Sequence, residues 1–263
     1  MLTWRVDRGV IAELHHAGRN LIRPWGIETA DSSGFFSLEP GIGYRHEREV
    51  EEYEGDHTRS ASRHVVRMPE GYWSLRTAAR VEGTVLHRQA TLHSLEDTIL
   101  MDFVMRFRFR REFFSTAQIA GKTIQHRRSD VYHQYAVRSA RLDGPEMSVV
   151  IEIENASCGR VMQPMLYVRD HADEWVVHAR MLPSEHRKEV IKVCNGWAGT
   201  RSLPSWMSGP ILAVPGLRTF LRYRNERKPY PRIIGRLFNP NAFPMAMLSG
   251  GESLAWNVRM SLV

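Results

Sequence analysis

Residues 99–109 alternate between apolar and polar side chains, and this pattern constrains the fold more than any other feature of the chain. Successive side chains of a β-strand point to opposite faces, whereas those of a helix repeat every 3.6 residues. The segment therefore predicts a half-buried strand with one wet side. We expect the core side to bury Phe103, Met105 and Phe107 together. The polar side includes Asp102, Arg106 and Arg108.

Strand signals also dominate the rest of the chain. Period-two alternation recurs at residues 147–154 and 256–262. Further candidate strands lie at 72–82, 84–93, 131–138, 161–168 and 175–179. Proline and glycine turn signals, such as Gly250-Gly251, separate them. Helix signals are few: residues 184–193 fit a short helix or a strand, and the acidic run 47–54 fits a solvated loop or edge.

Many antiparallel strands with few helices are typical of a sandwich or barrel. We expect an all-β fold, a large two-sheet antiparallel β-sandwich with few short helices. A sandwich of this kind can reach about 250 residues as one domain, and no convincing linker interrupts the chain. The expected organisation is therefore a single β-sandwich domain over residues 1–263.

Composition narrows the function classes. The net charge is +7, and 32 of the 36 basic residues are arginine. One interpretation is a site for an anionic ligand, because the planar guanidinium suits carboxylates and phosphates; the other is an arginine-rich genome. The arginines are dispersed without interleaved aromatics, which argues against nucleic acid. No apolar run is long enough for a membrane helix, so we expect no membrane partner and a cytoplasmic protein.

Cysteine content and motifs exclude several other classes. Two cysteines, Cys158 and Cys194, cannot build a disulfide framework or a four-thiolate zinc site. The acidic segment 170–174 lacks the spacing of a zinc motif and fits a charged turn. No Gly-x-Ser-x-Gly elbow, P-loop or dinucleotide fingerprint is present. We therefore expect no metal and no cofactor.

The two ends of the chain resemble a known family. Residues 9–14 and 19–22 are apolar-rich runs around His15-His16-Ala17-Gly18, where Gly18 can supply the positive φ of a tight turn. This predicted hairpin is similar to the first hairpin of galactose-mutarotase-like (aldose 1-epimerase-like) proteins. Residues 239–256 resemble that family's closing segment, in which a glycine–glutamate turn precedes the last strand. The resemblance implies a β-supersandwich that binds carbohydrate on its concave face.

The resemblance also implies roles for particular residues. Aldose mutarotases use a histidine acid and a glutamate base, and His133 is a loose match to the histidine. The stretch that would carry the glutamate, residues 233–238, holds no carboxylate. Arg45, His46 and His57 follow the order of the arginine and histidine with which mutarotases hold sugar hydroxyls. Loop solvation is the alternative for these three residues.

The chain itself offers catalytic candidates. His133 and Tyr135 lie two apart on an expected strand, so they share a face, and two polar rings there suit proton transfer on a sugar. Polar flanking residues include Arg127, a candidate for substrate binding. Glu152 and Glu154 share a face on another expected strand and could serve acid–base chemistry. A satisfied, partly buried pair and a plain solvent face are the respective alternatives.

These observations predict a carbohydrate-active protein. The leading hypothesis is an enzyme that applies acid–base chemistry to a mono- or oligosaccharide, as an epimerase or mutarotase does, and the sugar could be anionic. His133, Tyr135 and Glu152 are the catalytic candidates. One alternative is a non-catalytic sugar-binding or assembly subunit, and another is a polysaccharide lyase or glycoside hydrolase on the same fold.

Overall fold

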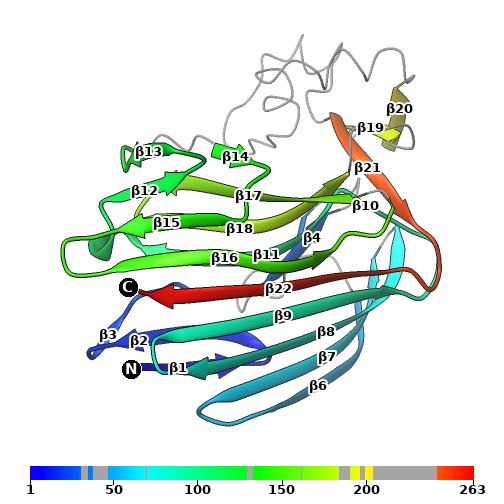
Figure 1. The fold of residues 1–263 in the computed structure, drawn as a ribbon. Coiled ribbons are helices and arrows are strands. Elements are labelled where there is room, and N and C mark those ends of the chain that lie inside the picture. Colours follow the sequence, from blue (N-terminus) through cyan, green and yellow to red (C-terminus); the bar gives the residue numbers. More distant parts are fainter. Residues whose placement is uncertain are drawn as a thin grey trace.

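The computed structural model describes residues 1–30, 35–37, 47–68, 70–128, 133–160, 162–183, 190–195, 199–203 and 242–263. These residues form an all-β structure dominated by two large antiparallel sheets. Figure 1 shows their long strands running across the molecule, with both chain ends on the same side. Within the described ranges, the single helical element is the 3-10 turn η1 (Arg111–Phe113). No described helix has the length and apolar character needed to cross a membrane.

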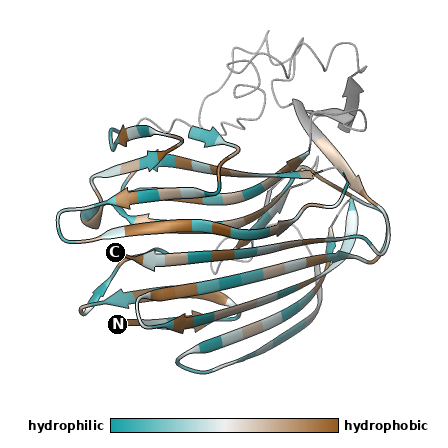
Figure 2. Cartoon of the chain, viewed as in Figure 1, coloured by the Kyte–Doolittle hydropathy of each residue, from teal (hydrophilic) through white to brown (hydrophobic). Residues whose placement is uncertain are grey.

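The larger sheet has nine strands, and its edge strand β6 contains the acidic run, as expected. Figure 2 shows hydrophilic and hydrophobic bands alternating along several of its strands. In spatial order the strands are β13 (Lys122–Gln125), β12 (Thr116–Ile119), β15 (Ser139–Asp143), β16 (Ser148–Ser157), β22 (Ser253–Leu262), β9 (Val85–Ser94), β8 (Gly71–Glu82), β7 (Arg59–Met68) and β6 (Glu47–Gly55).

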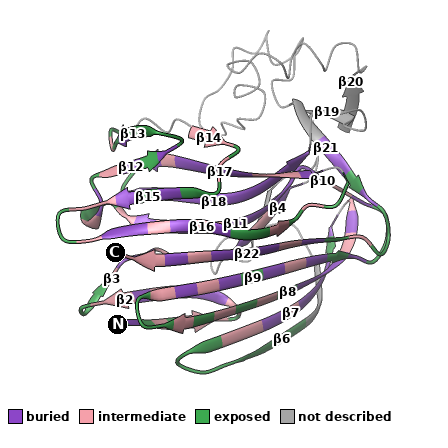
Figure 3. Ribbon diagram, viewed as in Figure 1, coloured by how far each residue is buried: buried purple, intermediate pink, exposed green. Residues whose placement is uncertain are grey.

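The second large sheet has six strands, and β11 and β18 pair at its centre over eight residue pairs. Figure 3 shows that β18 is buried along its whole length. In spatial order the strands are β14 (His133–Tyr135), β17 (Met162–His171), β18 (Glu174–Pro183), β11 (Asp102–Arg110), β4 (Ile27–Ala30) and β5 (Phe35–Ser37).

Two smaller sheets complete the described fold. The three-stranded sheet contains β1 (Leu2–Asp7), β2 (Val10–His16) and β3 (Arg19–Asn20). The four-stranded sheet contains β10 (Thr98–Leu100), β21 (Ala242–Leu248), β19 (Val190–Asn195) and β20 (Gly199–Leu203). Residues 190–193, which fitted either a helix or a strand, lie in strand β19.

The N-terminal hairpin is confirmed, with one addition. Ala17 and Gly18 have φ values of +49° and +77° between β2 and β3, and both being positive is typical of a tight hairpin turn. However, β2 pairs over most of its length with β1, which the sequence analysis did not predict. The glycine–glutamate turn before the last strand is also present, because Glu252 Oε2 accepts the Ser249 N–H at 2.7 Å.

The main hydrophobic core includes side chains from both large sheets. Phe103, Met105 and Phe107 on β11 are at most 1% exposed, as expected. Trp25 packs edge-on against the Phe107 ring, with centroids 4.9 Å apart. The indole N–H of Trp256 on β22 donates to the Phe103 carbonyl at 3.1 Å, which ties the two sheets together.

The expectation of a wet side for β11 is wrong. Asp102 is only 2% exposed, and the Arg106 side chain is 13% exposed. The alternation itself is correct, but both faces of the strand are largely removed from water. The buried charges are compensated, because the neighbouring strands β4 and β18 place opposite charges beside these polar side chains.

Truncation of Phe107 tests the core assignment. We expect Phe107→Ala to lower the free energy of unfolding by about 3–5 kcal/mol, because a buried aromatic ring leaves a cavity. Met247→Ala, at a side chain that is 55% exposed, should change it by about 0.5 kcal/mol or less. Urea unfolding followed by circular dichroism measures both. A loss below about 1 kcal/mol for Phe107→Ala would contradict the packing described.

Candidate functional site

A row of charged and polar side chains covers the face of the six-stranded sheet opposite the core. The strand register brings them together: Arg106 pairs with His178, and Val104 lies between Glu28 and Arg180. Side chains at paired positions point to the same face of a sheet. We call this set the charged face. It comprises Glu28, Asp102, Arg106, Arg108, Gln134, Tyr167, Arg169, Glu174, His178 and Arg180.

Each carboxylate of the charged face has an arginine partner. At one end of β11, Arg180 contacts Asp102 Oδ2 through Nη2 at 2.6 Å and through Nε at 2.7 Å. Near the other end, Arg108 contacts Glu174 through Nη2 at 3.0 Å. Because Asp102 and Glu174 are 2% and 3% exposed, water screens these pairs little. Removal of one partner would therefore leave a buried charge with less compensation.

The centre of the charged face holds His178 beside a third ion pair. Arg106 donates to Glu28 Oε1, and His178 Nε2 lies 3.7 Å from Glu28 Oε2. The Tyr167 ring packs edge-on against the imidazole, with centroids 4.4 Å apart. Arg180 comes from two positions further along the same strand. The arrangement combines a ring nitrogen, a carboxylate and two guanidinium groups at one place.

His178 is neutral at pH 7. The side chain is 8% exposed, and burial, together with Arg106 and Arg180, holds the pKa of its imidazole well below the usual range. The Nε2 atom is buried and has no hydrogen-bond partner among the described residues. A neutral imidazole can accept a proton at an unprotonated ring nitrogen, which is the property needed for a general base.

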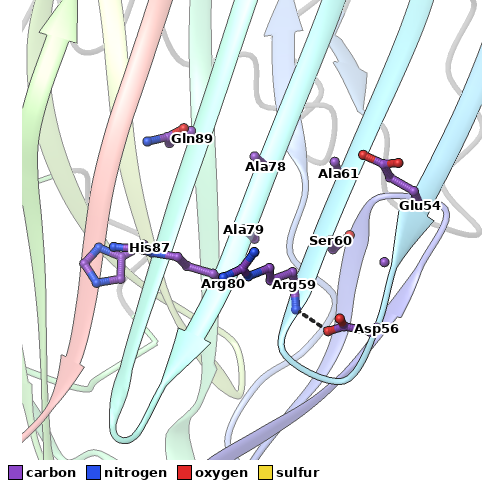
Figure 4. Close-up of a pocket in the computed structure, with 11 residues that line it drawn as sticks. Glu54, Asp56, Arg59, Ser60, Ala61, Ala78, Ala79, Arg80, His87 and Gln89 are labelled. Carbon is purple, nitrogen blue, oxygen red and sulfur yellow. Dashed lines mark hydrogen bonds between the residues drawn. The ribbon is translucent and has the colours of Figure 1, made fainter.

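A second candidate surface lies on the outer side of the nine-stranded sheet. Arg59, Arg80 and His87 extend from neighbouring strands around a hollow of about 670 Å³ (Figure 4). Asp56 at its rim is a turn residue: it accepts the backbone N–H groups of Thr58 and Arg59 at 2.6 and 2.8 Å, which lowers its pKa to about 2. The Arg80 side chain is 52% exposed. Water screens this surface more strongly than the charged face, which we favour as the functional site.

The predicted pair His133 and Tyr135 lies on β14. They do share a face, but it is the one that includes Val168 and Leu166, both fully buried; Gln134 lies on the charged face. Burial lowers the pKa of His133 despite the nearby Asp170 carboxylate. The catalytic role of the pair stays a prediction.

Arg127 lies near this pair, and its backbone N–H donates to Asp170 Oδ2 at 2.9 Å. Asp170 also acts electrostatically on His133, so the structure brings Arg127 and His133 around one buried carboxylate. The expected contact of the Arg127 side chain with substrate stays a prediction.

The other predicted residues lie elsewhere. Glu152 is on the nine-stranded sheet, where its Oε2 atom is 2.5 Å from Arg259 Nη2. His57 is exposed in the turn between β6 and β7. Arg45 and His46 lie outside the described residues. The structure thus does not place Glu152 on the strand face that His133 and Tyr135 share, and the roles of all four residues remain untested.

The centre of the charged face was not predicted from the sequence. Glu28 and Arg180 were not considered, and His178 was noted only as part of a candidate strand. One signal was available. Glu174, His178 and Arg180 stand at alternate positions of the strand 174–183, so they share one of its faces, just as the polar residues of 102–108 share one face of their strand. The register that aligns the two polar rows comes from tertiary structure.

Other chemistry has little support in the described residues. No group of three or more histidine, cysteine, aspartate or glutamate side chains there could hold a metal ion. Burial raises the pKa of the Cys158 thiol to about 11, so it is protonated at pH 7 and a poor nucleophile. Cys194 belongs to β19, where side chains are not described.

The buried ion pair of Asp102 and Arg180 leads to a prediction about stability. Arg180→Met should lower the free energy of unfolding by about 3–5 kcal/mol, because it leaves the Asp102 carboxylate buried without its guanidinium. The matched control is Arg259→Met, which removes the partner of Glu152 where both side chains are about 40% exposed; it should cost about 1 kcal/mol or less. Urea titrations of both variants give the comparison, and equal losses would contradict it.

The lowered pKa of His178 leads to a prediction about how the stability of the protein depends on pH. The unfolded chain binds a proton at an ordinary histidine pKa of about 6.5, whereas folded His178 stays neutral to lower pH. Stability should therefore fall as pH drops below about 6.5, by at most about 1.4 kcal/mol per pH unit for this residue. His178→Gln should lose less stability than wild type between pH 7.5 and 5.5 in urea titrations. The exposed-histidine control His93→Gln should keep the wild-type dependence; identical curves for all three would refute the prediction.

Comparisons with known proteins address the fold. No protein-family model matches the sequence, and no curated protein matches it significantly. Among solved structures, the chain is similar to a galactose mutarotase related enzyme from Lactobacillus acidophilus, with 8% identity, a TM-score of 0.51 and coverage of 100% of this chain and 97% of that chain. It also matches a galactose mutarotase-like protein from Lactobacillus casei, with 9% identity, a TM-score of 0.47 and coverage of 100% of both chains.

The first of these matches spans nearly the whole of both chains. At this identity the similarity concerns the fold alone. The resemblance at the two ends of the sequence is therefore confirmed at the level of architecture: the chain has a β-sandwich fold similar to that of galactose-mutarotase-like proteins.

Proposed function

We propose that the protein binds a carbohydrate on the charged face and catalyses proton transfer on it, as an epimerase or mutarotase does. The observation that carries the proposal is His178. Its imidazole is neutral and buried, with Nε2 3.7 Å from Glu28 Oε2 and with Arg106 and Arg180 beside it. A ring nitrogen without a hydrogen-bond partner among the described residues is suited to a substrate hydroxyl.

The neighbours of His178 have complementary roles in this proposal. Tyr167, edge-on to the imidazole, restricts the orientation of the ring. Arg106 and Arg180 are donors for sugar oxygens, and in a poorly hydrated site they would also stabilise negative charge that develops on oxygen during proton transfer. Glu28, whose Oε2 lies 3.7 Å from His178 Nε2, is a hydrogen-bond acceptor for a substrate hydroxyl.

An anionic sugar fits the charge of this face better than a neutral one. The face carries four arginines against three carboxylates, while His178 is neutral. Arg23 adds a further positive charge, with its Nε 3.3 Å from Glu174 Oε2. A uronic acid or sugar phosphate would compensate the excess through charge-assisted hydrogen bonds. The similar solved structure from Lactobacillus acidophilus is described as a galactose mutarotase related enzyme, which agrees with a sugar ligand.

The functional test combines binding and turnover. We expect galacturonate or galactose 6-phosphate to raise the melting temperature more than galactose does, because a ligand stabilises the state that it binds. Wild type should accelerate exchange between sugar anomers in two-dimensional exchange NMR. His178→Gln should lower that rate by about a hundredfold or more, the scale of a general acid–base group, while the exposed control His93→Gln should retain it.

Three outcomes would count against this proposal. Binding without accelerated exchange in wild type would favour the non-catalytic sugar-binding subunit. Loss of exchange in His133→Gln with full activity in His178→Gln would place catalysis at the pair His133 and Tyr135. No stabilisation by any sugar tested would remove the carbohydrate hypothesis itself.

A further inference from the structure

A basic pocket of about 730 Å³ lies where β11 ends and η1 begins. We define it by six of its lining residues: Arg23, Arg110, Arg111, Glu112, Ser115 and His126. Three of the six are arginines, contributed by the segment before β4, the end of β11 and the start of η1. None of the proposed catalytic groups lines this pocket.

Backbone pairing holds the three arginines in place. The N–H of Arg23 donates to the Arg108 carbonyl at 3.0 Å, and the N–H of Arg111 donates to the Asp173 carbonyl at 3.1 Å. The side chain of Arg110 is oriented by its Nε, which donates to the Ile22 carbonyl at 3.1 Å. The positive charges are therefore attached to ordered backbone, which lowers the entropic cost of converging on a ligand.

The pocket carries an excess of positive charge. Its two lining carboxylates are Glu112 and Asp173. Arg128 neutralises Asp173 from outside the lining, with Nη2 2.8 Å from Oδ1. Glu174, which faces Arg23, is shared with Arg108. The lining therefore holds three arginines, and Glu112 is its one carboxylate without a cation partner among the described residues.

His126 adds a neutral acceptor to the pocket. Its Nε2 lies 3.2 Å from the Glu174 carbonyl oxygen, which can only accept, so Nε2 carries the hydrogen. Burial lowers the pKa of this imidazole, so the ring is neutral at pH 7. The Nδ1 atom is then an acceptor, and it is buried without a hydrogen-bond partner among the described residues. An acceptor beside several cationic donors suits an anion that also carries a hydroxyl.

We infer that the basic pocket binds a phosphate group, either as inorganic phosphate or as a monoester of a small molecule. A phosphate has three terminal oxygens and up to two negative charges, which match three guanidinium groups better than a carboxylate does. A protonated phosphate oxygen, or a hydroxyl of the ester, can donate a hydrogen bond to His126 Nδ1. This site is separate from the proposed sugar chemistry at His178 and does not depend on it.

Isothermal titration calorimetry on the full chain tests the inference, in a phosphate-free buffer at constant ionic strength. We expect inorganic phosphate or glycerol 3-phosphate to bind, and acetate to bind more weakly by about tenfold or more. The comparison of the two phosphates distinguishes the free anion from the ester as the favoured ligand. Arg111→Gln should weaken binding by about tenfold, the scale of one charge-assisted hydrogen bond.

Matched variants separate this site from general electrostatics. Glu112→Gln should tighten phosphate binding several-fold, because it removes a lining carboxylate. Arg80→Gln, the same charge change on the nine-stranded sheet, and His178→Gln on the charged face should leave it unchanged. The inference is overturned if no phosphate binds, if Arg80→Gln weakens binding as much as Arg111→Gln, or if Glu112→Gln weakens it. Circular dichroism of each variant verifies the fold.

Discussion

The rest of the structure depends on the two-sided strand β11. Its apolar side places Phe103 and Phe107 in the core between the sheets, and its carbonyls accept hydrogen bonds from across that core. The Trp256 indole donates to the Phe103 carbonyl at 3.1 Å, and Arg88 Nη1 donates to the Arg106 carbonyl at 3.0 Å. The packing that positions this strand also positions the charges on its other side.

Those charges are rigid because they are buried in pairs. An exposed ion pair contributes little and is readily exchanged for water, whereas a buried pair must keep its partner. Asp102 with Arg180, Glu28 with Arg106, and Glu174 with Arg108 form such a series along β11. Between them His178 stays neutral, since burial disfavours the imidazolium and the nearby arginines disfavour a further positive charge, both of which lower its pKa. In the proposed function, this neutral histidine is the group that takes part in proton transfer.

This arrangement gives some of the arginines a structural role. Several of them compensate buried carboxylates, and others leave an excess of positive charge at the end of β11. Glu174 stands at the boundary, because Arg108 approaches it from the charged face and Arg23 from the basic pocket. Sugar binding and phosphate binding are therefore proposed at neighbouring but chemically different places: one has a neutral imidazole among paired charges, the other has unbalanced guanidinium groups.

The sequence by itself determined the local structure and the architecture. Period-two alternation in 99–109 predicted a strand and its core side, the glycine at position 18 predicted the first hairpin turn, and the chain ends indicated the fold. It could not determine which polar faces meet. Arg106, His178 and Glu28 lie on three strands that are far apart in sequence, and only the register of β4, β11 and β18 aligns them. For this reason a strand face that was predicted to be solvent-exposed is buried, and the proposed proton-transfer site had no recognisable sequence motif. Alternation distinguishes the two faces of one strand. Burial and charge pairing depend on the neighbouring strands.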